Sequence, residues 1–168
     1  MATQKKTGGG APLLQRPDLD EGALRAGLEL IDGLEGGQDD PLEGWLFSGM
    51  EAAWASADGV ELRQCLLRGC VLRMANFSLS KAQDVRFAQC DLTEAALRDL
   101  RECKRVEFSA CDLRRAELAG TRLAGIDLTT CEIGGNTWGP GLAEVRGAIV
   151  TPLQAMELAR ALGVRIQD

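Results

Sequence analysis

The chain has 168 residues, of which 45% are apolar, a length and composition that suit one folded domain and exclude wholesale disorder. Its net charge is −6, but residues 1–58 hold four basic and eleven acidic side chains, whereas residues 59–168 hold fifteen and fourteen. This nearly neutral body lacks the basic face of a nucleic-acid-binding protein. Histidine is absent, which removes the commonest general base and metal ligand, so we expect no enzyme, cofactor or metal site.

The sequence also indicates where the protein works. It contains no run of eighteen apolar residues, so we expect no membrane-spanning helix. Residues 1–10 include lysines but no apolar core, so no secretory signal is visible. We therefore predict a cytoplasmic protein whose six cysteines stay reduced.

The N-terminal part is acidic and has little regular pattern. Residues 1–17 contain three consecutive glycines and no apolar periodicity, which predicts a disordered tail. Residues 18–44 form an acidic segment in which apolar residues at helical spacing predict a short helix over residues 20–32, as part of an N-terminal cap. Two glycines inside this helix oppose it.

From Trp45 to Trp138 an apolar residue recurs at every fifth position. A period of five suits neither a helix, whose period is about 3.6, nor an alternating strand. It predicts a chain that turns a corner once per five residues, so that four sides close a square coil of about twenty residues and coils stack roughly 4.8 Å apart. The centres are Phe47, Ala52, Ala57, Leu62, Leu67, Leu72, Phe77, Ala82, Phe87, Leu92 and Leu97, then Cys103, Phe108, Leu113, Leu118, Leu123, Leu128, Ile133 and Trp138.

One extra residue interrupts this series. Leu100 keeps the earlier register and Cys103 the later one, so the insertion falls at Arg101–Glu102. Any other placement would point a charged side chain into the core. We therefore predict a β-bulge at Arg101–Glu102.

Several of the five-residue units share one pattern: a small residue, then Asp or Asn, then Leu or Phe, then two variable residues. The segments Ala75–Leu79, Cys90–Glu94, Cys111–Arg115 and Ala116–Gly120 follow or approach it. The pattern resembles the pentapeptide-repeat protein family over roughly residues 45–138. The resemblance implies an all-β fold, a right-handed quadrilateral β-helix.

Residues 139–168 are expected to cap the open end of this solenoid, because stacked coils leave unpaired backbone and apolar surface at their ends. Residues 143–150 are predicted to be extended. A capping α-helix is predicted at about residues 152–162, with Thr151 as its N-cap and Gly163 just after its end. The apolar side chains in and after this helix would cover the last coil.

Two columns of side chains could carry chemistry. Cys70, Cys90, Cys111 and Cys131 recur at spacings of twenty and twenty-one residues and could form a thiol relay or metal site, but buried structural thiols are the favoured interpretation.

Asp91, Asp112 and Glu132 share an outward column that could bind a cation or a basic partner. We favour carboxylates that accept hydrogen bonds from corner amides and are neutralised by Arg73 and Arg114. The row of Arg86, Glu107 and Asp127 has the same explanation.

A cluster of basic residues surrounds the predicted bulge. It consists of Arg98, Arg101, Lys104 and Arg105, and it lies on an irregular, exposed segment. Loops on rigid scaffolds often carry recognition, so these four residues are the candidate partner contact. The other interpretation is a solvated group of surface charges.

Two functions follow from these observations. The leading one is a non-catalytic scaffold, a monomer or homodimer, whose flat faces bind an unknown protein partner without contacting nucleic acid or membrane. The alternative follows from the resemblance, which implies a DNA mimic that binds DNA gyrase or another topoisomerase. The nearly neutral body offers little phosphate-like potential for that role.

Overall fold

The structure is a computed structural model that describes residues 17, 19, 21, 24–26 and 41–167. The predicted disordered tail and most of the acidic segment 18–44 therefore lie outside the described residues. In the part that is described, no helix has the length and apolar content needed to cross a membrane.

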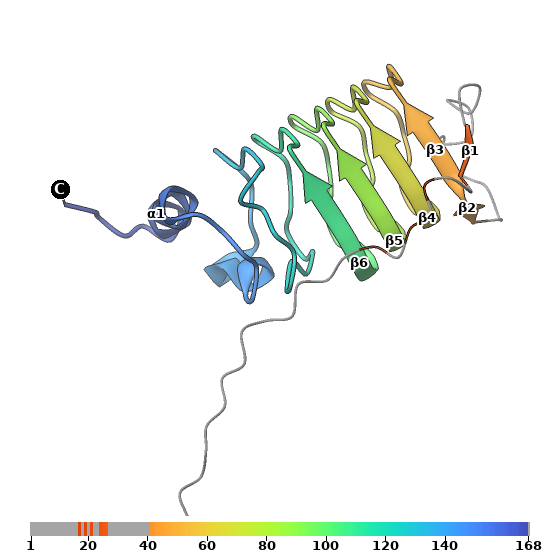
Figure 1. Cartoon of the computed structure of the whole chain (residues 1–168). Coiled ribbons are helices and arrows are strands. Elements are labelled where there is room, and N and C mark those ends of the chain that lie inside the picture. The colour runs from red at the N-terminus through yellow and green to blue at the C-terminus, as the bar shows by residue number, and fades with distance from the viewer. Residues whose placement is uncertain (1–16, 18, 20, 22–23, 27–40, 168) are drawn as a thin grey trace, which may run out of the picture.

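Successive coils stack into a rod (Figure 1). One side of the rod is a parallel sheet in the order β1-β3-β4-β5-β6, with β2 paired to β4. The predicted fold class, a right-handed quadrilateral β-helix with a C-terminal helix, is confirmed. The strands are β1 Arg25–Ala26, β2 Leu42–Glu43, β3 Trp45–Ser48, β4 Glu61–Arg68, β5 Lys81–Ala88 and β6 Arg101–Ser109.

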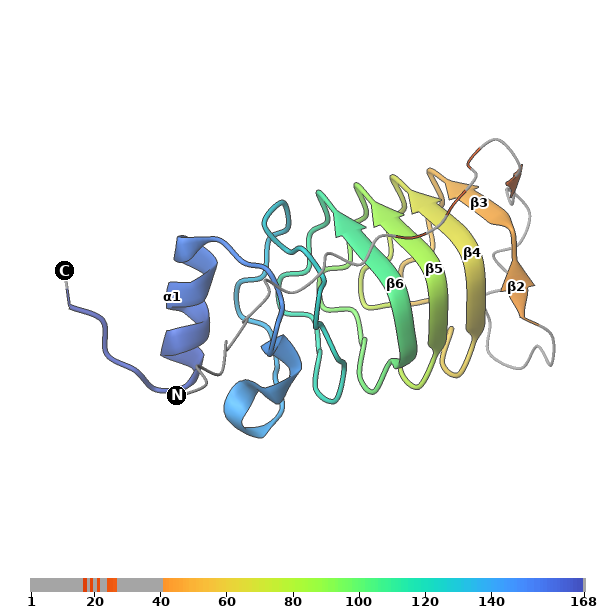
Figure 2. The same cartoon turned by 60° about the horizontal axis from the view of Figure 1, so that its bottom comes forward.

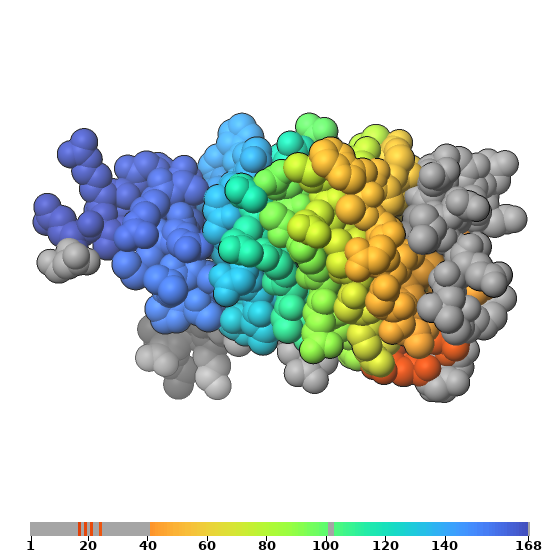
Figure 3. All heavy atoms as spheres, turned by 90° about the horizontal axis from the view of Figure 1, so that it is seen from above, coloured from red at the N-terminus to blue at the C-terminus, as the bar shows by residue number. Residues whose placement is uncertain are grey.

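Neighbouring coils pair with the predicted offset. Cys65 of β4 lies opposite Val85 of β5, twenty residues later. The same offset continues outside the strands, where Val71 pairs with Asp91 in an isolated parallel bridge. Figure 3 shows the coils as successive colour bands along the rod, with the C-terminal residues at one end.

The core is a stack of the residues that the five-residue series places inside. Leu92 and Leu113 are fully buried, as the series requires. Phe87 stacks on Phe108 with ring centroids 5.1 Å apart, and it meets Phe77 edge-on at 6.1 Å. Like side chains therefore repeat from coil to coil, which gives each coil the same interior width.

The corners have a left-handed backbone, as one of their columns illustrates. Trp54, Met74, Glu94, Arg115 and Gly135 all have φ between 57° and 71°. This conformation costs a residue with a side chain about 1–2 kcal/mol, but glycine adopts it freely. The amides of the first four each donate to a carbonyl of the following coil, which offsets that cost.

The predicted bulge is confirmed. Lys81 pairs with Arg101 at an offset of twenty residues, whereas Gln83 pairs with Lys104 at an offset of twenty-one. The extra residue therefore lies between Arg101 and Lys104 in β6. The bulge absorbs the inserted residue, so the apolar side chains of all later coils still point inward.

The coil pattern extends beyond Trp138. The amides of Leu123 and Leu128 donate to Glu144 and Ile149, over 3.0 and 2.9 Å. Residues 144–149 therefore add a partial coil to the stack, which the sequence did not reveal because this segment lacks the five-residue pattern.

The prediction that residues 143–150 are extended is wrong over their first part, because a 3-10 helix, η3, spans Pro140–Val145. Pro140 starts this turn and Gly141, at φ 71°, redirects the chain. The Glu144 carboxylate holds the turn against the coil by accepting the amide of Gly120 over 2.9 Å.

The predicted C-terminal helix is present as α1, Pro152–Ala161. Thr151 and Gln154 form a capping box, in which each side chain accepts the other's backbone amide over 3.2 and 2.8 Å. Gly163 follows the helix with φ 81°. Figure 2 shows α1 beyond the last coil, at the opposite end of the rod from β2 and β3.

The expectation that all the apolar residues of this region cover the last coil is wrong. Leu158 packs against the core, but Leu153 and Leu162 are 66% and 56% exposed. Only one side of α1 contacts the solenoid, and the buried residue on it is the polar Gln154.

The predicted helix at residues 20–32 is contradicted at Arg25–Ala26, which form β1. These residues pair in parallel with Trp45 and Leu46 of β3, again at an offset of twenty. A strand is favoured because the first full coil otherwise leaves an unpaired edge. The solenoid also begins before Trp45, since Leu42 of β2 pairs with Leu62.

Candidate protein-interaction surface

The sheet has an outer side that follows from strand geometry. In β4, Cys65 and Leu67 point into the core, so Leu66 and Arg68 between and beyond them point outward. The register places Arg86 of β5 beside Leu66. We call the surface formed by Leu66, Arg68 and Arg86 the outer face.

Leu66 is 0% exposed although it does not belong to the core. An outward leucine can be fully buried only if chain outside the solenoid covers it. The nearest described candidate is the N-terminal segment, in which Pro17 is buried and Leu19 is half-buried.

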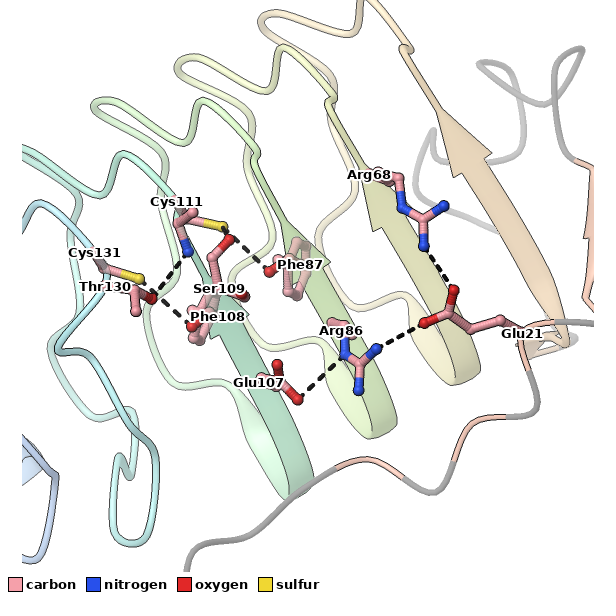
Figure 4. A network of polar contacts seen from close by, with 11 residues as sticks. Glu21, Arg68, Arg86, Phe87, Glu107, Phe108, Ser109, Cys111, Thr130 and Cys131 are labelled. Carbon is pink, nitrogen blue, oxygen red and sulfur yellow. Dashed lines mark hydrogen bonds and ion pairs between the residues drawn. The ribbon is translucent and has the colours of Figure 1, made fainter.

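Glu21 fixes the segment to the outer face (Figure 4). Its carboxylate accepts from Arg68 over 2.6 Å and from Arg86 over 2.8 Å. Arg86 also pairs with Glu107 over 3.2 Å. Glu21 therefore bridges β4 and β5 beside Leu66. We call the described residues from Pro17 to Ala26 the strap.

The four basic residues of the predicted partner contact have different surroundings. Arg98 pairs with Glu117 over 3.0 Å, and Arg105 makes two hydrogen bonds of 2.5 Å to the buried carboxylate of Asp84. Arg101 and Lys104 lie at either end of the bulge in β6. Lys104 is exposed, and the side chain of Arg101 lies outside the described part of the chain.

These contacts divide the four residues into two groups. Arg98 and Arg105 are neutralised by carboxylates, and Arg105 compensates a charge that would otherwise be buried alone. Lys104 presents its charge to solvent, on a strand next to the equally exposed Lys81. A partner contact at these positions stays a prediction.

Within the predicted acidic column of Asp91, Asp112 and Glu132, the two aspartates have the structural role that the sequence favours. Asp91 accepts the amide of Thr93 over 3.1 Å and pairs with Arg73 over 3.3 Å. Asp112 accepts the amide of Arg114 over 3.1 Å and pairs with its guanidinium over 2.5 Å. The side-chain hydrogen bond from Arg114 lowers the pKa of Asp112 below its ordinary value.

These ion pairs lie in an open groove beside the corner column. Trp54 and Met74 line it together with the arginines and carboxylates, and Trp54 is 72% exposed. Glu94 and Arg115 form a third ion pair in the groove, over 2.7 Å. The charges within the groove therefore balance, and they favour no ligand of one sign.

The row of Arg86, Glu107 and Asp127 is only partly an ion-pair row. Arg86 and Glu107 face each other in register and form their ion pair. Asp127 accepts the amide and hydroxyl of Thr129 instead, over 2.9 and 2.6 Å. Asp127 therefore stabilises its own corner.

The cysteine column is part of the packing. Cys70, Cys90, Cys111 and Cys131 are buried, and each donates its thiol hydrogen to a carbonyl of the preceding coil over 3.3–3.5 Å. Two of these contacts, from Cys111 and Cys131, are drawn in Figure 4. No set of three or more metal-ligating side chains is arranged for a metal among the residues that are described.

Burial also makes the thiols of Cys65 and Cys103 poor nucleophiles. Desolvation raises the pKa of Cys65, and it raises the pKa of Cys103 to about 11. Since the thiolate is the reactive form, these side chains have little reactivity near neutral pH.

The repeats of the solenoid match a known protein family. A family model described as pentapeptide repeats (8 copies) matches residues 61–99. Residues 61–99 are therefore pentapeptide repeats. These pentapeptide repeats correspond to β4, β5 and the corners between β4 and β6, so the predicted resemblance is confirmed.

Solved structures match the chain at low sequence identity and low TM-score. A trypsin-treated variant of QnrB1, a plasmid-mediated fluoroquinolone resistance protein, is 16% identical, with 80% of this chain and 93% of that chain covered and a TM-score of 0.32. Rfr23, a pentapeptide repeat protein from the cyanobacterium Cyanothece 51142, is 16% identical, with 66% and 88% covered and a TM-score of 0.25. None of the curated proteins matches the chain.

The sequence did not reveal the contact between Glu21 and the outer face. One signal for it exists, because the five-residue frame assigns Leu66 to an outward position. Leu46 occupies the same position one coil earlier. Two large apolar residues in one outward column indicate that something covers that column.

Proposed function

We propose that the protein is a non-catalytic cytoplasmic scaffold that binds a protein partner through the outer side of its parallel sheet. The observation that carries this proposal is the Glu21 contact. Glu21, which lies outside the solenoid, neutralises Arg68 and Arg86 on the outer face, and Leu66 beside them is fully buried. The face therefore has the charge and apolar surface that binding of a protein segment requires.

The rigidity of the rod supports the same proposal. Neighbouring coils are joined by backbone hydrogen bonds along the whole stack, and stacked side chains fill the interior. A rigid surface loses little conformational entropy when a partner docks. The exposed charges of Lys81 and Lys104, on strands of the same sheet, extend the basic area. The contact predicted at Arg98, Arg101, Lys104 and Arg105 would adjoin it.

The alternative of DNA mimicry has less support. A mimic needs rows of carboxylates that present negative potential to solvent. The carboxylates of Asp91 and Asp112 are instead paired with arginines. The ion pairs make the column locally neutral, so the scaffold is the better-supported function.

Affinity capture with immobilised full-length protein tests the proposal. Baits are the wild type, Glu21→Lys, the double variant Arg68→Glu/Arg86→Glu, and Arg63→Glu as a control, because Arg63 is an exposed arginine of β4 that pairs with Glu61. We expect at least one protein to be captured by the wild type or by Glu21→Lys. Arg63→Glu should still capture that protein, and the double variant should not. Background proteins alone on every bait would contradict the proposal.

A further inference from the structure

We propose that the outer face binds an extended acidic segment of the partner, and that the strap is an internal competitor that occupies the same position. This inference rests on the proposed function and specifies its ligand. The occupant is defined by chemistry: a carboxylate for the two arginines, flanked by apolar side chains for the surface around Leu66.

The charges of the face define the first requirement. Arg68 and Arg86 come from adjacent strands, and one carboxylate reaches both, over 2.6 and 2.8 Å. Arg86 keeps its contact with Glu107 at the same time. A carboxylate between the two guanidinium groups is thus compatible with every other ion pair that the face makes among the described residues.

The apolar part of the face defines the second requirement. Leu66 lies opposite Arg86 and two residues before Arg68 in β4, and it is 0% exposed with the strap in place. A ligand that supplied only charge would leave this side chain in water, which is unfavourable. The strap supplies both, since Leu19 and Leu24 are half-buried on either side of Glu21.

The strap is suited to exchange. Its ion pairs join side chains that are 27–45% exposed, and such pairs contribute little individually. It is joined to the body through β1, so it competes as an intramolecular ligand at high effective concentration. The apparent affinity of an external segment is therefore reduced by the fraction of molecules whose face is occupied.

A labelled peptide with the sequence of residues 17–26 is the probe. Fluorescence anisotropy measures its binding to full-length wild type, to Glu21→Lys, and to Glu94→Lys as a matched control that breaks an ion pair in the groove. We expect the peptide to bind Glu21→Lys at least tenfold more tightly than the other two proteins, because its strap is repelled by the arginines. Equal affinities for Glu21→Lys and Glu94→Lys would overturn the competition.

A charge exchange locates the binding site. The double variant Arg68→Glu/Arg86→Glu should no longer bind the original peptide, and it should bind a peptide in which lysine replaces Glu21. Circular dichroism checks that the variant is folded. Binding of the original peptide to the folded double variant would overturn the assignment. A wild-type dimer in sedimentation that dissociates in Glu21→Lys would also overturn the assignment, because the occupant would then be the strap of a second copy.

The peptide and capture experiments fail independently. A captured partner that Glu21→Lys binds no better than the wild type would remove the strap's role and leave the scaffold intact. Tight peptide binding without any captured protein would leave a functional face and contradict the proposed function.

Discussion

The side-chain amide of Gln154 donates to the carbonyl oxygen of Leu128 over 2.8 Å, from α1 to the last full coil. It donates over the same distance to Cys131. In earlier coils, the carbonyl equivalent to that of Leu128 accepts from a cysteine of the following coil, as Phe108 does from Cys131. Gln154 therefore takes the place of the next cysteine and ends the column with its hydrogen bonds satisfied.

Replacing Gln154 with alanine should destabilise the C-terminal end. The change removes one hydrogen bond from each of two buried carbonyl oxygens, of which that of Leu128 keeps the amide of Cys131 over 2.9 Å. Loss of a donor to a buried acceptor costs about 1–3 kcal/mol. We expect the free energy of unfolding, measured in urea, to fall by about 2 kcal/mol or more. Gln83→Ala, at an exposed position of β5, is the control and should change it by less than about 0.5 kcal/mol. Equal effects of the two changes would show that the cap is not made by Gln154.

The raised pKa of Cys103 predicts a loss of stability in alkaline solution. Its pKa rises from 9.0 to about 11 on folding, so above pH 9 the unfolded chain releases this proton first. The contribution of Cys103 to stability is complete below pH 9 and is lost as the pH rises through about 11. Urea unfolding at several pH values should show a shallower decline for Cys103→Ala than for the wild type. Parallel declines would contradict the assignment.

The opposite sign applies to Asp112. Its pKa is lowered by Arg114, so its contribution to stability is present above the ordinary pKa of 3.8 and is lost as the pH falls through the folded value. Carbon-detected NMR should show the Asp112 carboxylate titrating below its ordinary range in the wild type. In Arg114→Ala the titration should move upward, whereas Arg122→Ala, an exposed arginine outside this column, should leave it in place.

Deleting one residue tests the bulge. Removal of Glu102 restores an offset of twenty residues between β5 and β6, so we expect a cooperative fold whose free energy of unfolding lies within about 1 kcal/mol of the wild type. Removal of Gln83 from β5, where it pairs with Arg63 of β4 and, beside the bulge, with Lys104 of β6, shifts the register against both neighbouring strands. That deletion should cost well over about 2 kcal/mol. Thermal and urea unfolding of the two deletions distinguish these outcomes, and equal losses would contradict the placement of the insertion.

Periodic features could be predicted from the sequence because they depend on local spacing. Leu92 and Leu113 face inward since every fifth residue does so, and the bulge follows because Arg101 or Glu102 would otherwise be buried. The acidic column could be predicted for the same reason, since an aspartate at a corner meets the amide two residues later.

Features outside the repeat could not be predicted in this way. Glu21 meets Arg68 and Arg86 across 47 and 65 residues of sequence, and no spacing rule connects them. The burial of Asp84 beneath Arg105 was also missed. The five-residue spacing identifies corner positions, but it does not indicate which basic side chain pairs with a carboxylate there. Arg105 was therefore predicted only as part of the candidate partner contact, although it compensates a buried charge.

The direction of the thiol hydrogen bonds has a consequence for how the rod is made. Each cysteine of the column donates backward, to a carbonyl that lies 23 or 24 residues earlier in the chain. A coil that leaves the ribosome thus finds its acceptor already synthesised and in position. We expect the solenoid to fold from its N-terminal end during synthesis, with each new coil forming on the coil before it. Gln154 then caps the stack once the last coil has formed.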